Sequence, residues 1–333
     1  MSVTGGEQIN ETVTIGRLGH RGDGIAETDT GLVYVPFTLP GERVEIDRTG
    51  ERGRLLNIFE TSPARTAPRC KHFGACGGCA LQHMKQNAYL AWKREQLHIP
   101  LSQRGIDAPV EPVEPVPIGS RRRAVFTARR VGKHSVFGYH ARQSHEIIKI
   151  EECPILSPEI ARVLPGLAEL AGPLTPLKGE VRIGVTATET GLDVAFEGPK
   201  PRPPALMALA APLLEKLGIA RLSIAGETVM SFAEPMVRVD GAEIDLPPLA
   251  FLQAASEAER IMGRLVLEGV AQAKEIAASK VAKVVAVSCN PATLARDLKT
   301  LVDGGYRIDR VTPVDQFLFS PHIEAVVQLS RDT

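Results

Sequence analysis

The chain has 333 residues, with 39 basic and 39 acidic side chains and a formal net charge of zero. This balance excludes a protein drawn to nucleic acid by its overall field, so any such contact must come from local clusters. No stretch approaches the roughly 20 apolar residues of a spanning helix, and MSVTGGEQINETVTIG lacks the basic and apolar regions of a secretory signal. We therefore expect a cytoplasmic protein without membrane contact, in which five cysteines favour metal binding or catalysis over disulfides.

Residues 12–60 have the pattern of short strands. The runs TVTIGRLG, LVYVPF, ERVEID and GRLLNIFE alternate apolar and polar positions between turn-forming residues, which is typical of a small barrel. In AYLAWKREQL, residues 88–97, the spacing of apolar and basic positions predicts a helix. The segment APVEPVEPVPIG, residues 108–119, is interpreted as a proline-rich connector.

A second β-rich region begins at Ser120. Its pattern predicts a strand pair in 120–150, a helix that opens at Pro158, a hairpin in 181–198, a linker in 199–205, one long helix over 254–280 and an apolar strand in 281–288.

Three cysteines lie close together in CKHFGACGGCALQH, at Cys70, Cys76 and Cys79, and Cys153 follows in EECPIL. Four thiolates are the ligand set of an iron–sulfur cluster or of a structural zinc ion, because soft metal centres prefer soft sulfur ligands. Zinc ribbons usually pair two short Cys knuckles, whereas this chain has one knuckle and two outlying cysteines. The spacing therefore favours an iron–sulfur cluster, with zinc as the alternative and metal-free buried thiols as the least favoured interpretation.

The fifth cysteine, Cys289, lies in VVAVSCNPATLARDL. The pattern predicts a strand that ends at Ser288 and a helix with Asn290 as its cap and Pro291 in its first turn. The positive end of a helix dipole favours thiolate, and open α/β sheets bind ligands at the ends of such strands. A lone cysteine at a strand end is nevertheless more often a packing residue than a nucleophile.

Taken together, the four clustered cysteines, the GGCxxQH run, SCNPATLARDL and a late HIE resemble the RNA uracil-5 methyltransferases. The N-terminal barrel resembles their TRAM module, and a TRAM barrel with a cluster indicates the RlmD-like branch, which methylates 23S ribosomal RNA. The resemblance implies an α+β multidomain fold and a monomer that binds RNA. Its expected domains are a TRAM OB-like β-barrel in 8–62, a central RNA-binding domain with the iron–sulfur cluster in 63–250, and a shortened Rossmann-like α/β methyltransferase domain in 251–333.

The resemblance also implies roles for individual residues. Cys289 would add to carbon 6 of uracil, S-adenosylmethionine would donate its methyl group to carbon 5, and Glu324 in SPHIEAVVQL would remove the carbon-5 proton as general base. A buried carboxylate with a raised pKa would suit that task; without the resemblance, Glu324 reads as a polar residue at the start of a strand. Gln253 in FLQAA matches a glutamine of the cofactor pocket, although the usual asparagine two residues later is Ala255 here.

Two basic segments are candidates for RNA contact. SRRRAVFTARR, residues 120–130, has five arginines that fit phosphates and Phe126, which could stack a base. A solvated basic face is an equally weighted interpretation of each arginine. A second basic surface is predicted near the cysteines, at Arg65, Arg69, Lys71 and His72.

The methyltransferase part is short for this family. The 83 residues from Phe251 onwards leave room for few βαβ units of about 30 residues each. The family's glycine-rich cofactor loop, acidic ribose-binding residue and Asp-Pro-Pro-Arg motif are absent, which favours an internal deletion joined near Val270. Two functions follow: an S-adenosylmethionine-dependent 23S ribosomal RNA methyltransferase, or an iron–sulfur RNA-binding protein that has lost methyl transfer.

Overall fold

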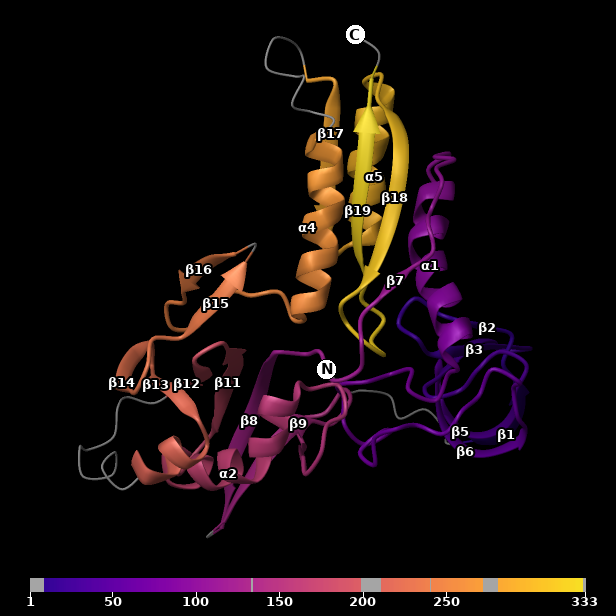
Figure 1. The fold of residues 1–333 in the computed structure, drawn as a ribbon. Coiled ribbons are helices and arrows are strands. Elements are labelled where there is room, and N and C mark those ends of the chain that lie inside the picture. Colours follow the sequence, from indigo (N-terminus) through magenta and orange to yellow (C-terminus); the bar gives the residue numbers. More distant parts are fainter. Residues whose placement is uncertain (1–8, 133, 199–210, 240, 272–280, 332–333) are drawn as a thin grey trace. The chain divides into compact units, whose positions relative to one another are not determined.

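A computed structural model describes residues 9–132, 134–198, 211–239, 241–271 and 281–331 (Figure 1). The chain forms two compact units. The first comprises Met1–Arg69, Cys79–Pro115 and Ile261–Thr333, and the second comprises Cys70–Gly78 and Val116–Arg260. The N-terminal barrel and the C-terminal sheet are therefore parts of one unit, and most of the second unit is inserted between them in sequence.

The N-terminal barrel sheet has six strands in the order β1-β5-β6-β4-β3-β2. Alternate residues point inward and form its core, among them Val33, Val35, Val44 and Ile46, none of which is exposed. The four predicted strand runs are confirmed, and β3 is an additional strand that the sequence reading missed. The bounds are β1 Ile9–Thr14, β2 Arg17–Leu18, β3 Gly24–Thr28, β4 Gly31–Val35, β5 Arg43–Thr49 and β6 Arg52–Glu60.

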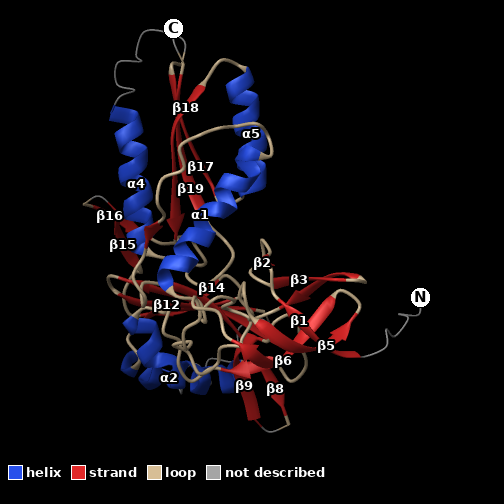
Figure 2. Ribbon diagram, turned by 90° about the vertical axis from the view of Figure 1, so that its right-hand side faces the viewer, coloured by secondary structure: helices blue, strands red, loops and turns tan. Residues whose placement is uncertain are grey.

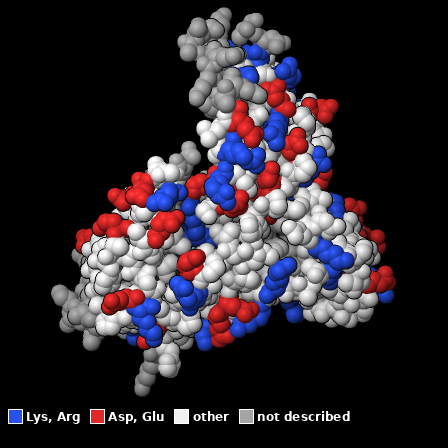
Figure 3. All heavy atoms as spheres, viewed as in Figure 1, with Lys and Arg blue, Asp and Glu red and all other residues white. Residues whose placement is uncertain are grey.

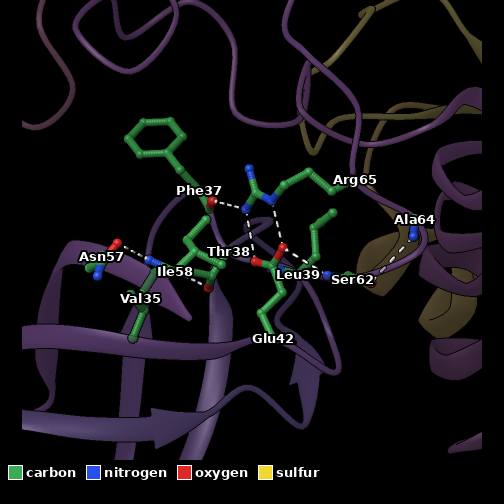
Figure 4. Close-up of polar contacts among 10 residues, drawn as sticks. All are labelled: Val35, Phe37, Thr38, Leu39, Glu42, Asn57, Ile58, Ser62, Ala64 and Arg65. Carbon is green, nitrogen blue, oxygen red and sulfur yellow. Dashed lines mark hydrogen bonds and ion pairs between the residues drawn. The ribbon is translucent and has the colours of Figure 1, made fainter. Parts of the chain in front are cut away.

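A buried ion pair ties the segment that follows the barrel to the turn between β4 and β5 (Figure 4). The Glu42 carboxylate, which is not exposed, accepts hydrogen bonds from Arg65 Nε at 2.5 Å and Arg65 Nη2 at 2.8 Å. It also accepts from the backbone N–H groups of Leu39 at 2.8 Å and Ser62 at 3.3 Å. Arg65 donates a further bond to the Phe37 carbonyl at 2.8 Å. Burial alone would raise the pKa of Glu42, but these donors and the Arg65 charge lower it.

The C-terminal part of the first unit is a four-stranded sheet in the order β17-β19-β18-β7. The central strand β19 pairs antiparallel with β17 and β18, so the described sheet is not the parallel sheet of a complete Rossmann-like domain. β7 lies parallel to β18, and the connector predicted over 108–119 is therefore partly a strand. The bounds are β7 Glu114–Pro115, β17 Lys283–Ser288, β18 Arg307–Asp315 and β19 Glu324–Ser330.

Helices cover both faces of this sheet (Figure 2). Helices α1, Gln86–Ser102, and α5, Pro291–Asp303, share one apolar core with it through residues such as Leu97, Leu298 and Val327. Helix α4, Ser256–Ala271, approaches the other face, where the Gln328 side chain donates to the Leu265 carbonyl at 3.1 Å. The helices predicted at 88–97 and after Cys289 are confirmed. The long helix predicted over 254–280 is described to Ala271, and its remainder lies outside the described residues.

The second unit is built on a seven-stranded sheet in the order β10-β9-β8-β11-β12-β13-β14, with helix α2, Pro158–Leu174, packed in its core. The predicted strand pair, helix start and hairpin are confirmed, whereas the linker 199–205 lies outside the described residues. The strand bounds are β8 Arg123–Val131, β9 His134–His140, β10 Ile147–Lys149, β11 Glu180–Thr188, β12 Gly191–Glu197, β13 Ile219–Ile224, β14 Glu227–Ser231, β15 Met236–Val239 and β16 Ala242–Asp245. Among the described residues, no helix has both the length and the apolar composition needed to cross a membrane.

Candidate active site

Cys289 lies at the junction between β17 and α5, as the sequence predicts. The strand ends at Ser288, and the Asn290 side chain caps α5 by accepting hydrogen bonds from the backbone N–H groups of Ala292 and Thr293, each at 3.1 Å. This cap fixes the residue that follows Cys289. The Cys289 side chain itself is exposed, which leaves the thiol accessible to a substrate.

Glu324 opens β19 at the same end of the sheet. In the β17–β19 pairing Ser288 lies opposite Ala325, so Cys289 and Glu324 are the next residues along the two strands. The Glu324 side chain is 8% exposed, and its Oε1 accepts a hydrogen bond from Gln316 Nε2 at 2.9 Å. Burial raises the pKa of this carboxyl, and the Gln316 bond offsets only part of that rise. The expected buried carboxylate with a raised pKa is therefore found.

A pocket of about 670 Å³ within the first unit opens onto the Cys289 thiol. That volume lies in the range of about 300–1,000 Å³ typical of ligand sites. Its wall combines Cys289 with Ile323, which directly precedes Glu324, and with the basic barrel residues Arg17 and Arg21. Tyr34 lines this pocket and also a second one of about 270 Å³, so the two pockets share a wall. The arrangement presents a thiol, cations and an aromatic ring to one bound molecule.

Gln253 lies in the second unit, before α4. Its backbone carbonyl accepts a hydrogen bond from Arg122 Nε at 3.2 Å, which is a structural contact. Its cofactor role stays a prediction.

The four clustered cysteines are divided between the units, with Cys70, Cys76 and Cys153 in the second and Cys79 in the first. Cys76 and Cys153 pack against the same apolar core. Burial raises the pKa of the Cys70 and Cys76 thiols. In the part of the chain that the structure describes, no three His, Cys, Asp or Glu side chains are gathered closely enough to hold a metal ion. The chemistry of four thiolates fits an iron–sulfur cluster.

The interpretation of Phe126 as a base-stacking residue is wrong. Its side chain is fully buried in the second unit, with ring centroids 4.8 Å from those of both Phe137 and Tyr139. The signal was present in the sequence, because Ala124 and Ala128, two residues away on either side, mark the same apolar face of β8.

Several arginines of residues 120–130 have partners within the protein. Arg122 pairs with Glu259, Arg129 with Glu180 at 3.3 Å, and the Arg130 guanidinium donates to the Gly172 carbonyl at 3.0 Å. These contacts give the three arginines a structural role in the second unit, which differs from both the RNA contact and the solvated basic face that the sequence suggested.

Three members of the second predicted basic surface have partners within the protein. Arg65 is held by Glu42, Lys71 pairs with Glu151 at 2.9 Å, and His72 Nε2 accepts a hydrogen bond from the Glu151 backbone at 3.2 Å. Basic and acidic side chains are interspersed on the face shown in Figure 3, as expected of a chain without net charge. The basic residues that line the Cys289 pocket were missed, although RLGHRG, residues 17–22, groups two arginines and a histidine between predicted strands.

Comparison with known proteins places these residues in a family. The profile of the TRAM domain matches residues 10–47, and the profile described as tRNA (Uracil-5-)-methyltransferase matches residues 267–332, which include Cys289 and Glu324. An uncharacterized RNA methyltransferase of Brucella suis is 37% identical over 405 residues, covering 96% of this chain and 97% of the relative. The chain belongs to the RNA uracil-5 methyltransferase family. By family it is therefore an enzyme.

Two further relatives show how far the likeness extends. The 23S rRNA (uracil(1939)-C(5))-methyltransferase RlmD of Photorhabdus laumondii is 28% identical, and the alignment covers 96% of each chain. Among solved structures, the tRNA (uracil-54, C5)-methyltransferase of Pyrococcus abyssi, in complex with S-adenosyl-L-homocysteine, has a TM-score of 0.68 at 19% identity. That match covers 96% of this chain and 99% of the other, and it shows a shared fold.

Proposed function

We propose that this member of the family forms 5-methyluridine in 23S ribosomal RNA through a covalent bond between Cys289 and carbon 6 of uracil. The observation that carries the proposal is the meeting of Cys289 and Glu324 at one end of the β17–β19 strand pair, beside a pocket with a basic wall. Support for 23S ribosomal RNA comes from the RlmD relative and from the cysteine pattern.

In this mechanism the Cys289 thiolate forms a sulfur–carbon bond at carbon 6, and the electron pair of the carbon 5–carbon 6 double bond makes carbon 5 nucleophilic. When bound, S-adenosylmethionine supplies the methyl group that carbon 5 takes up. The Glu324 carboxylate then accepts the proton from carbon 5, the double bond forms again, and Cys289 leaves as thiolate. The Gln316 hydrogen bond holds the Glu324 carboxyl, and burial gives that carboxyl the basicity the step needs.

The pocket residues have a corresponding role toward RNA. A uracil that reacts at carbon 6 must leave its stack, and the flanking strand must be held while it does. Arg17 and Arg21 line the same pocket as Cys289 and would bind phosphates, and the Tyr34 ring would stack on a base. This assignment replaces residues 120–130 as the main RNA contact.

A second candidate function is an iron–sulfur RNA-binding protein that has lost methyl transfer. The alignment with the Brucella suis relative runs over 405 residues, more than the 333 of this chain, so the relative has residues without a counterpart here, which supports an internal deletion. Between Gln253 and Cys289 the described residues provide α4 and β17, and no strand followed by a glycine-rich turn and a helix. Cys289 and Glu324 account for adduct formation and proton removal. The described residues between Gln253 and Cys289 do not fit the usual site for S-adenosylmethionine.

Binding of S-adenosylmethionine to the purified full chain separates the two functions. Calorimetry that gives a micromolar Kd supports the methyltransferase. No binding at millimolar ligand refutes it and leaves the RNA-binding protein.

We also propose that Cys70, Cys76, Cys79 and Cys153 hold a 4Fe–4S cluster with a structural role. Protein purified without oxygen should contain about four irons and four sulfides per chain, as expected for this ligand set. Zinc without sulfide would refute the cluster and weaken the link to the RlmD-like branch.

A further inference from the structure

A buried ion pair in the first unit joins α1 to the end of β18. Lys93 Nζ lies 2.8 Å from Asp315 Oδ1, and neither side chain is exposed. Tyr89, one helical turn earlier in α1, donates its hydroxyl to the same Asp315 oxygen at 3.0 Å. Two side chains of one helix thus converge on a single carboxylate oxygen at the point where β18 ends.

The same two side chains also hold the segment that follows Asp315. Tyr89 Oη accepts a hydrogen bond from the backbone N–H of Phe319 at 2.8 Å. Lys93 Nζ donates to the backbone carbonyls of Phe317, at 3.4 Å, and His322. The backbone between β18 and β19 is therefore fixed at its beginning, middle and end by α1.

This segment forms part of the candidate active site. It begins with Gln316, which donates to Glu324, and it ends at Ile323, which lines the Cys289 pocket and directly precedes Glu324. Because the segment is short and held at three points, its conformation determines where the Glu324 carboxyl lies relative to Cys289.

Stability alone does not explain the pair. A buried ion pair must overcome the cost of removing both charges from water, and apolar residues of similar size are often as stabilising. Asp315 Oδ2 is buried and receives no hydrogen bond from the described residues, so this carboxylate is not fully compensated. The pair instead fixes the position of the backbone that follows Asp315.

We propose that Lys93 and Tyr89 are positioning residues, which hold the 316–323 segment so that Glu324 faces the substrate bound at Cys289. The role of Glu324 as base rests on the proposed function. The restraint on the segment is argued from the contacts that α1 makes with it.

The test uses Tyr89→Phe in the full chain, with Tyr306→Phe as the matched control. Both changes delete one hydroxyl, and Tyr306 donates its hydroxyl to the Val281 carbonyl at 2.7 Å, away from the 316–323 segment in sequence and in its contacts. Loss of the acceptor for the Phe319 N–H should speed amide hydrogen exchange in the segment about fivefold, as expected for one net hydrogen bond. Tyr306→Phe should leave exchange there unchanged.

The second readout is the pH titration of Glu324, followed by carbon-13 NMR of labelled glutamate carboxyls and assigned by the Glu324→Gln spectrum. Burial is the main cause of the raised pKa, so a loosened segment should lower the Glu324 midpoint toward the ordinary value of about 4.3. Tyr306→Phe should not move it. Unchanged exchange and an unchanged Glu324 midpoint in Tyr89→Phe would overturn the proposal.

A paired replacement, Lys93→Met with Asp315→Leu, guards against misfolding because it leaves no lone buried charge. We expect this variant to fold, to show the same shift of the Glu324 midpoint and to lose protection over 316–323. A folded double variant with a wild-type midpoint would also refute the proposal. Neither readout needs RNA or S-adenosylmethionine, so failure of methyl transfer and failure of positioning are distinguishable.

Discussion

Replacing Arg65 by Met tests how the barrel is fastened to the segment that leads to the cysteines. The change removes the guanidinium that donates to both Glu42 oxygens and leaves the carboxylate buried with only the backbone donors of Leu39 and Ser62. Removing one partner of a buried ion pair lowers the free energy of unfolding by about 3–5 kcal/mol. Because the Arg65 side chain is 20% exposed, we expect a loss at the lower end of this range, about 3 kcal/mol. Arg54→Met breaks an exposed pair with Asp47 in the same barrel and should cost about 0–1 kcal/mol.

The pH dependence sharpens this test. In the wild type the pKa of Glu42 is lowered, so its contribution is present above the unfolded value of about 4.3 and is lost as pH falls through the lower folded value. In Arg65→Met burial dominates and raises that pKa, so the variant regains stability as pH falls. The difference in the free energy of unfolding between the wild type and Arg65→Met should therefore be smaller at pH 5 than at pH 7. Native-state hydrogen exchange of peptides from β4 and β5 measures it without assuming two-state unfolding of the whole chain. An Arg65 effect no larger than that of Arg54, or a difference that is constant with pH, would refute the reasoning.

Three other predictions concern the site and its surroundings. Cys289→Ala should abolish the denaturation-resistant complex that the wild type forms with 5-fluorouridine-containing 23S ribosomal RNA and S-adenosylmethionine on a denaturing gel; a complex that persists would exclude Cys289 as nucleophile. Glu324→Gln should slow product release about 10²–10⁴-fold with ordinary RNA while the methylated adduct accumulates on the same gel, and normal turnover would remove its role as base. Burial, with a smaller effect of the Arg65 charge, lowers the pKa of His83 in the folded protein to about 4. Below about pH 6.5 the unfolded chain therefore binds a proton that the folded protein does not, and the free energy of unfolding falls. His83→Phe should lack the loss of about 2 kcal/mol that the wild type shows in urea unfolding between pH 7.5 and pH 5, and equal pH dependence would contradict this.

The sequence predicts features that depend on neighbouring residues. The end of β17 at Ser288, the Asn290 cap and the start of α5 follow from local turn and capping chemistry, and they are found as predicted. The barrel strands follow from alternation of apolar and polar positions. The same rule identifies Phe126 as a core residue, because it shares a face of its strand with Ala124 and Ala128. The prediction that Phe126 stacks a base rested on the neighbouring arginines and ignored this face.

Features that join distant segments were not predictable from one sequence. Nothing local in the proline-rich stretch indicates that β7 pairs with β18, because the pairing joins segments about 200 residues apart. The partners of Arg65 and Lys71 likewise come from elsewhere in the chain, and without them both residues read as free basic charges. Gln316 was missed for the same reason: its importance lies in its bond to Glu324.

The contact between Lys93 and Asp315 has a consequence for how the protein is made, because 222 residues separate its two ends. At about 5–20 residues per second, α1 leaves the ribosome about 10–45 s before the strand that neutralises its lysine. During that interval the apolar side of α1, with Leu97 and Leu101, has no sheet to pack against. The inserted second unit can complete its own core first. A chain that stops before Asp315 would therefore expose this side of α1 to chaperones and proteases.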